Sequence, residues 1–163
     1  LLGSGTILRE VIHASEMLLE EWGVAADIWG CPSFTELGRD IQRTNRVNLL
    51  NPTQPSTLSH VENCLKDKDG PVIAATDYIR AFAEQIRPAI QQVGKRYSVL
   101  GTDGFGRSDT RENLRHFFEV DRRWITVAAL KALADDGLID FAIVGQAIEK
   151  YALDPKKPNP MSV

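Results

Sequence analysis

The hydrophobic pattern changes its period within the first thirty residues of the chain. Between Thr6 and Trp22, apolar side chains recur every three or four positions with charged residues opposite them, which predicts an amphipathic helix. Gly23 follows directly and should end this helix in a left-handed conformation. The next run, Val24–Trp29, is short and mostly apolar, so it predicts a buried strand.

Three further short apolar runs predict the remaining strands. These runs are Leu1-Leu2, Val72–Ala75 and Tyr97–Leu100. Because Leu1-Leu2 stands directly before Gly3-Ser4-Gly5, we interpret it as the end of a strand that begins earlier. The chain is therefore expected to be a piece of a longer protein.

Helices are predicted between and after the strands from their capping residues. The N-cap candidates are Ser33, Ser59, Asp77, Asp109, Asp121 and Asp140. The helix after Ser33 should reach about Thr44, and the helix after Asp77 should bend or end at Pro88. The apolar face of that second helix is expected to carry Tyr78, Ile79, Phe82, Ala83, Ile86 and Ile90. The last two helices are expected at 122–136 and 140–151.

Strands that alternate with helices predict an α/β fold with a largely parallel sheet. Residues 1–153 contain all of these elements and are predicted to form a single domain. Residues 154–163 contain three prolines and are expected to form an extended or disordered tail.

Composition narrows the range of functions. The 163 residues are 43% hydrophobic and 25% charged, as in an ordinary soluble globular protein. The formal charge of −3 comes without a clustered basic surface, which argues against nucleic-acid binding. No apolar run approaches the roughly 20 residues needed to span a membrane. Cys31 and Cys64 lack the paired spacing of zinc or redox sites, so we expect two reduced thiols in a cytoplasmic protein.

Two glycine-rich turns precede predicted helices, a position where backbone amides can bind an anion. They are Gly3–Gly5 and Gly101–Asp109. Neither matches a dinucleotide-binding or phosphate-loop fingerprint, and Asp103 and Asp109 would repel a phosphate. We favour a structural turn with positive φ at its glycines, with anion binding as the alternative.

Other reactive side chains show no catalytic spacing. The three histidines are His13, His60 and His116. They are far apart in the sequence, and we expect none of them to bind a metal. Arg107, Arg111 and Arg115 would share one helix edge if the helix began slightly early. They could pair with carboxylates of this domain, which we favour, or with carboxylates across an interface.

Several segments resemble one enzyme family. Residues 101–115, GTDGFGRSDTRENLR, carry most of the resemblance, together with Ser33–Leu37, Thr76–Tyr78 and the opening Leu1–Gly5. They are similar to the C-terminal domain of the homodimeric bacterial pyruvate dehydrogenases, and the similarity extends over essentially the whole chain. More distantly, Phe105–Ser108 is similar to the FGAS segment of transketolases.

This resemblance implies a parent enzyme that depends on thiamine diphosphate. Such an enzyme oxidatively decarboxylates pyruvate and passes the acetyl group to the lipoyl group of a dihydrolipoyl acetyltransferase. It implies a cytoplasmic homodimer in a multienzyme complex. It also implies a three-layer α/β/α domain like the transketolase C-terminal domain. The central sheet of that domain would be mixed and five-stranded, with four parallel strands and one antiparallel strand. In this family the diphosphate, the magnesium and the aminopyrimidine are held by other domains.

The residues of this chain agree with that division of labour. A thiamine site in the family uses a GDG motif followed roughly thirty residues later by paired asparagines, whose oxygens suit magnesium. Here Thr102-Asp103-Gly104 and the single Asn113 depart from the pattern. We therefore assign no catalytic, cofactor or metal residue to this chain and expect it to be inert alone. Thiamine diphosphate and magnesium would bind elsewhere in the parent.

One turn is predicted to contact the rest of the protein because it is elaborate and lacks ligand chemistry. The candidate contact residues are Gly104, Phe105, Gly106, Arg107 and Ser108. Their expected partners are other domains of the same polypeptide or the second subunit of a homodimer. Two alternatives remain. One is a free-standing module that binds a small anion at the helix starts after Gly5 and Gly106. The other is an interaction domain that recruits partner subunits.

Overall fold

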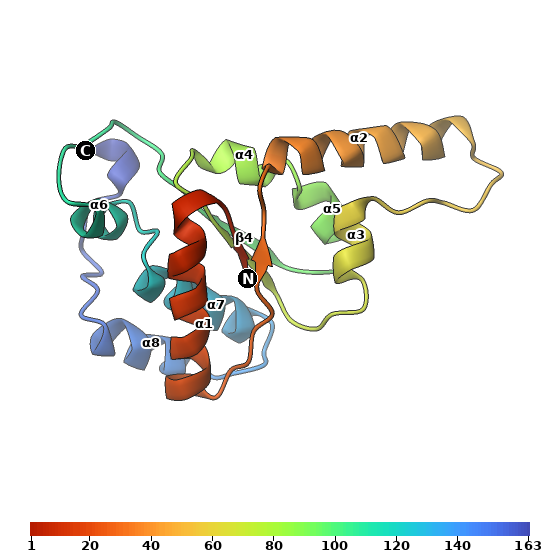
Figure 1. The fold of residues 1–163 in the computed structure, drawn as a ribbon. Helices are drawn as coiled ribbons and strands as arrows, with labels where there is room; N and C mark the ends of the chain where they lie inside the picture. Colours follow the sequence, from red (N-terminus) through yellow and green to blue (C-terminus); the bar gives the residue numbers. More distant parts are fainter.

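Four parallel strands form the central sheet of the computed structural model, which describes all residues from Leu1 to Val163 (Figure 1). The strands are β1 (Leu2–Gly3), β2 (Trp29–Gly30), β3 (Val72–Ala75) and β4 (Tyr97–Leu100). Their order across the sheet is β2-β1-β3-β4, and every neighbouring pair is parallel. β1 and β3 have strand partners on both sides and are fully buried.

Helices cover both faces of this sheet. One face packs against α1 (Leu8–Trp22), α7 (Arg122–Asp135) and α8 (Phe141–Lys150). The other packs against α2 (Phe34–Leu50), α3 (His60–Leu65), α4 (Arg80–Glu84) and α5 (Arg87–Gln92). The remaining helix, α6 (Arg111–Phe117), follows the glycine-rich loop and packs near α1. The predicted α/β class and largely parallel sheet are confirmed.

The alternation of side chains along β3 divides the core between the two faces. Ile73 packs in the same cluster as Leu18 of α1 and Leu130 of α7. Val72 and Ala74 point the opposite way and join the cluster formed with α2, α3 and α5. A four-residue strand thus connects both hydrophobic layers.

The fifth, antiparallel strand that the family resemblance implied is absent, so the expectation of a five-stranded mixed sheet is wrong. The sequence holds four apolar runs of strand type, and each supplies one strand. Further along the chain, Phe118 and Val120 are buried in the turn that ends α6. There the Val120 amide donates to the Arg115 carbonyl at 2.9 Å, and Glu119 has a φ of 62°. Because this amide is satisfied inside the turn, it does not extend the sheet beyond β4.

The first predicted helix is confirmed, and the strand predicted after it is mostly wrong. A short 3-10 turn at Gly5–Ile7 leads into α1, and Gly23 ends α1 with a φ of 67°. Of the run Val24–Trp29, only Trp29 belongs to a strand, and Ile28 is exposed. β2 is an edge strand that pairs with β1 over two residues, so its outer side faces solvent and needs no continuous burial.

Most predicted capping residues are confirmed. Asp121 and Asp140 accept hydrogen bonds from amides at the starts of α7 and α8, and Ser59 forms a complete capping box with Glu62. Ser33 caps α2 by accepting from the Glu36 amide. At α6 the cap is Thr110 instead of Asp109, one residue later than predicted.

Asp77 does not cap a helix, contrary to the prediction. α4 begins only at Arg80, with Ile79 at its N-cap position. The predicted helix is also divided in two, and Pro88 lies in the first turn of α5. Proline is favoured at that position because its missing amide has no helical partner there.

α2 extends to Leu50, well beyond the predicted end at Thr44. Its first half is anchored in the core by Phe34 and Ile41. Its second half projects from the body of the molecule together with the following loop (Figure 1). As a result Leu49 is 77% exposed. None of the helices is both long and apolar enough to cross a membrane.

Residues 154–163 return to the body of the molecule beside α6 and the glycine-rich loop (Figure 1). They end in a 3-10 turn at Pro160–Ser162, in which Pro160 is buried. The segment is therefore not extended throughout. The division into a domain of residues 1–153 and a separate tail stays a prediction.

Candidate functional site

The loops that follow β1, β3 and β4 meet at the carboxyl edge of the sheet, where open α/β folds usually bind ligands. The hydroxyl of Ser4 after β1 donates to the hydroxyl of Thr76 after β3 at 2.7 Å, and both residues are buried. The Thr76 hydroxyl also accepts from the Tyr78 amide at 3.2 Å. This edge is closed by hydrogen bonds between its own loops.

Asp77 also connects the loops at this edge of the sheet. Its backbone carbonyl accepts from the Thr102 hydroxyl at 2.7 Å, and its carboxylate accepts from the Thr6 hydroxyl at 3.3 Å. A side-chain carbon added at Gly5 would lie 3.3 Å from the Asp77 carboxylate. A negative charge therefore stands beside the start of the first helix, where a phosphate would have to sit, and it disfavours an anion there.

Asp103 fixes the glycine-rich loop to the start of α4. Its carboxylate accepts from the Arg80 amide at 3.1 Å and pairs with Arg80 Nε at 3.1 Å. Gly101 is needed at this crossing, because a side-chain carbon there would lie 2.9 Å from the Arg80 backbone nitrogen. Asn113, the other residue considered for a thiamine site, donates its side-chain amide to Asp109 at 2.8 Å. These residues do not fit a magnesium diphosphate group.

The five predicted contact residues form one exposed stretch of the loop. Phe105 is 79% exposed, while the Arg107 guanidinium lies 5.0 Å from the centre of the Phe117 ring. Gly104 has a φ of 103° and lies against the backbone of Pro160. The structure thus brings these residues together on the surface, and their contacts with a partner stay a prediction.

Sequence reasoning missed an aromatic surface next to this loop. Tyr78 and Phe82 were expected on a buried helix face, but they are 62% and 40% exposed and stack edge to face with ring centres 5.6 Å apart. Ile79 beside them is also exposed. Tyr78 and Ile79 were misplaced because α4 begins only at Arg80, so both residues precede the helix.

The histidines remain apart in the structure, each with its own neighbour. His13 lies 3.0 Å from Glu16, and His116 Nδ1 lies 3.1 Å from the carboxylate of Asp121. His60 lies 3.6 Å from the Cys64 sulfur. No group of three or more His, Cys, Asp or Glu side chains is placed to hold a metal ion.

Glu10 forms a charged cluster that the sequence did not reveal. Its side chain is 5% exposed and pairs with Arg115 of α6 at 2.9 Å and Arg122 of α7 at 2.9 Å. Burial alone would raise the pKa of Glu10. The hydrogen bonds and the charge of Arg122, together with the charge of Arg115, outweigh this effect and lower the pKa. Arg115 thus pairs with a carboxylate of its own domain, as favoured above. Glu10 escaped notice because it was assigned to the polar face of its helix.

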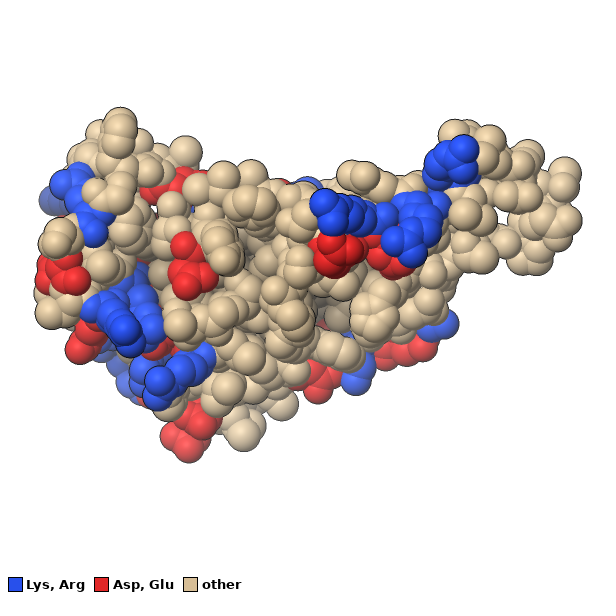
Figure 2. All heavy atoms as spheres, turned by 45° about the horizontal axis from the view of Figure 1, so that its top comes forward, with Lys and Arg blue, Asp and Glu red and all other residues tan.

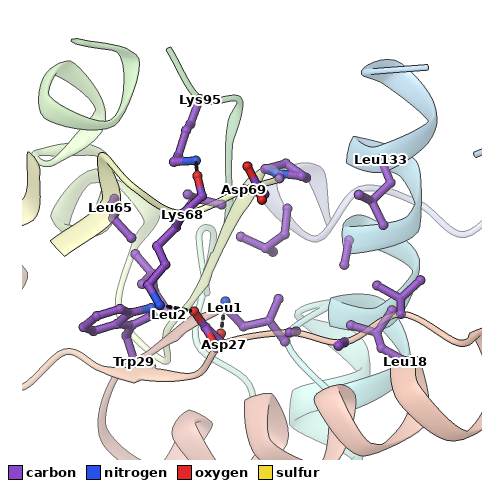
Figure 3. A pocket seen from close by; sticks show the side chains of 18 residues that line it. Leu1, Leu2, Leu18, Asp27, Trp29, Leu65, Lys68, Asp69, Lys95 and Leu133 are labelled. Atoms are coloured by element: carbon purple, nitrogen blue, oxygen red, sulfur yellow. Dashed lines mark hydrogen bonds and ion pairs between the residues drawn. The ribbon is translucent and has the colours of Figure 1, made fainter. Parts of the chain in front are cut away.

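A cavity of about 350 Å³ lies at the opposite, amino edge of the sheet (Figure 3). Its walls are mostly apolar, and at its mouth Lys68 pairs with Asp27 at 2.9 Å. The Leu1 nitrogen donates to the Asp27 carbonyl at 2.6 Å. The Lys68 ammonium and the Asp27 carboxylate thus compensate each other at the mouth of the cavity.

Neither the charged surface nor the two cysteines form a further candidate site. On the face seen in Figure 2, charged side chains gather over the projecting arm of α2 and at the far end of the molecule, and each group mixes both signs. Both cysteines are free. Cys31 lies in the core, where burial raises the pKa of its thiol to about 11, so it packs as a small hydrophobe as predicted.

Comparison with known proteins places this fold in a family. The transketolase-like TK C-terminal domain matches residues 1–121. The pyruvate dehydrogenase E1 component of Cupriavidus necator is 66% identical over the whole chain, which covers 18% of that protein. The corresponding proteins of Pseudomonas aeruginosa and Escherichia coli K12 are 55% and 48% identical over 99% and 98% of this chain, which again covers 18% of each.

The chain thus spans less than a fifth of the length of these relatives. The predicted resemblance to the C-terminal region of bacterial pyruvate dehydrogenases is confirmed. The chain belongs to the transketolase-like C-terminal domain family.

Proposed function

We propose that this chain is the C-terminal domain of a thiamine diphosphate-dependent pyruvate dehydrogenase. The parent enzyme oxidatively decarboxylates pyruvate and acetylates the lipoyl group of a dihydrolipoyl acetyltransferase. In this proposal the parent is a cytoplasmic homodimer in a multienzyme complex. The names and high identities of the relatives support this assignment.

Within that parent, the domain is structural and supports the dimer, and it contributes no catalytic or cofactor-binding residue. The observation that carries this role is the carboxyl edge of the sheet. Its polar side chains are used to join one loop to another, as in the pairs Ser4–Thr76 and Asp103–Arg80. Around them lie exposed apolar side chains, namely Tyr78, Ile79, Phe82 and Phe105. An edge whose polar side chains pair with one another and whose apolar side chains are exposed suits a protein contact better than a small ligand.

The absence of a cofactor site is tested by calorimetric titration of the purified chain with thiamine diphosphate and magnesium. We expect no heat of binding, because the carboxylates of Asp77 and Asp103 stand beside the two candidate anion sites. Saturable binding would instead mean that Gly3–Gly5 or Gly101–Ser108 is an anion site, and the assigned division of labour would be wrong.

The contact role of the loop is tested by Arg107→Ala in the full polypeptide. Its guanidinium lies on an exposed loop and packs only against Phe117 in this domain. We expect subunit association to weaken about tenfold, the effect of removing an arginine that contributes more than about 1 kcal/mol to an interface. Sedimentation velocity measures the association, with Arg9→Ala as the control, because Arg9 is exposed on α1 and forms no ion pair. If both variants associate equally well, the proposed contact role of Arg107 is wrong.

No observation favours the free-standing anion-binding module. Both glycine-rich turns carry a carboxylate close to the backbone that would receive the anion. If the purified chain bound inorganic phosphate tightly in the same calorimeter, that second function would have to be considered again.

A further inference from the structure

Lys157 fastens the segment of residues 154–163 to the end of α6. Its ammonium donates to the Phe117 carbonyl at 2.7 Å and to the Glu119 carboxylate at 2.8 Å. The same ammonium lies 5.4 Å from the centre of the Phe117 ring and 5.6 Å from that of Trp124. The Lys157 side chain is 16% exposed, whereas its neighbour Lys156 is exposed. Lysine is rarely buried to this extent unless its charge is compensated, and here two aromatic rings and a carboxylate compensate it.

Beyond Lys157 the segment touches the backbone of the glycine-rich loop. Asn159 caps the 3-10 turn by accepting from the Met161 amide at 3.0 Å, and this turn buries Pro160. A side-chain carbon added at Gly104 would lie 2.6 Å from the Pro160 carbonyl oxygen. Gly104 also has a φ of 103°, a conformation that residues with side chains rarely adopt. Two segments far apart in the sequence therefore meet backbone to backbone, and only glycine fits at the crossing.

Phe117 joins the two contacts. Its ring receives the Arg107 guanidinium from the loop at 5.0 Å and the Lys157 ammonium from the segment at 5.4 Å. The segment thus contacts the loop directly at Gly104. It also contacts the Phe117 ring, against which Arg107 of the loop packs.

We propose that residues 154–163 act as a strap that fixes the conformation of the glycine-rich loop, with Lys157 as its anchor. The strap presents Phe105 and Arg107 to a partner in a single arrangement, which reduces the entropy lost on docking. This role does not depend on which partner the loop contacts.

Limited trypsin digestion of the 163-residue chain tests the anchor. Cleavage after Arg107 reports opening of the loop, and cleavage after Arg9 in α1 reports global unfolding. In Lys157→Met we expect cleavage after Arg107 to accelerate about tenfold, the effect of losing one partly buried cation–π and ion-pair contact. Cleavage after Arg9 should not change. Lys156→Met is the matched control and should digest like the unmodified chain. Equal rates after Arg107 in the two variants, or equal acceleration at both sites in Lys157→Met, would overturn the proposal.

The reverse coupling provides a second test. Gly104→Ala should displace the segment from the loop side, because the new methyl group meets the Pro160 carbonyl. We expect the amides of Lys157 and Ser162, which donate to Asp154 and Asn159, to exchange with deuterium about tenfold faster. Unchanged exchange at both amides would show that loop and segment are independent, and the strap would be rejected.

Discussion

At Glu10, one buried carboxylate holds three helices together. It lies in α1 and pairs with Arg115 of α6 and Arg122 of α7, whose backbone amide also donates to it at 3.2 Å. Charges taken out of water destabilise a protein unless they are paired, and removing one member leaves the others uncompensated. Because both arginines are partly exposed, water takes over some of that compensation.

We predict that Glu10→Gln lowers the free energy of unfolding by about 1–2 kcal/mol at pH 7, less than for a fully buried pair. The folded state lowers the pKa of Glu10, so its contribution is complete above the ordinary value of 4.5 and is lost as pH falls through the folded pKa. Urea denaturation at several pH values should show the two proteins converging below pH 4.5. Glu20→Gln on the exposed side of α1 is the control. A difference that does not depend on pH would contradict the assignment.

At the scale of one element, α7 shows how a capping residue positions a core helix. Asp121 accepts from the amides of Arg123 and Trp124 at 2.9 and 3.1 Å, and its other oxygen contacts His116. The helix that follows buries Ile125 and Leu130 against the sheet. The start of α7 is therefore fixed from α6 as well as by its own cap.

We predict that Asp121→Ala lowers the free energy of unfolding by about 1–2 kcal/mol, the range for loss of a good N-cap. Asp140→Ala is the matched control, because Asp140 caps α8 through the Ala142 amide alone and lies in an exposed position. Chemical denaturation should show a clearly smaller loss for Asp140→Ala. Equal losses would mean that burial and the His116 contact of Asp121 add nothing to the cap.

At the scale of the whole molecule, the apolar surface is unevenly distributed. Three buried clusters hold the sheet and its helices together. In contrast, Leu49 and Leu50 are 77% and 59% exposed at the end of the projecting arm of α2. Exposed leucines on an arm outside the core are a feature of surfaces that contact another protein.

We predict that Leu49→Ser changes the free energy of unfolding of this chain by no more than about 0.5 kcal/mol. Ile41→Ser, in the anchored half of the same helix, should cost about 3 kcal/mol or more because Ile41 is buried. Urea denaturation measures the free energy of unfolding of both variants. In the full polypeptide Leu49→Ser should weaken assembly, as measured by sedimentation. A stability loss near that of Ile41→Ser would place Leu49 in the core of the fold.

Much of the fold could be predicted from local pattern. β3, β4 and α1 each follow from a short apolar run or from three-to-four periodicity, and the caps of α7 and α8 were found from single aspartates. The edge strand β2 was predicted too long, because local hydrophobicity does not tell how many partners a strand has. The fifth strand came from the family resemblance alone, and the sheet has only four strands.

The candidate site shows the same division. The sequence singled out Gly101–Ser108 as an unusual turn, and its run of glycines and polar residues determined that it would be an exposed loop. Only the tertiary structure showed that Asp77 faces Gly5, that Glu10 lies between two arginines and that Lys157 reaches the Phe117 ring.

By itself, then, the sequence determined the α/β class, the positions of the main helices and the family. These depend on periodicity, capping and motif, which are properties of neighbouring residues. The number of strands, the pairing of charges and the closing of the carboxyl edge were decided by tertiary structure. They depend on contacts between residues 23 to 112 positions apart, such as Asp103 with Arg80 and Glu10 with Arg122. Such contacts leave no local pattern, because their energy arises only when the packed helices and strands bring the partners together.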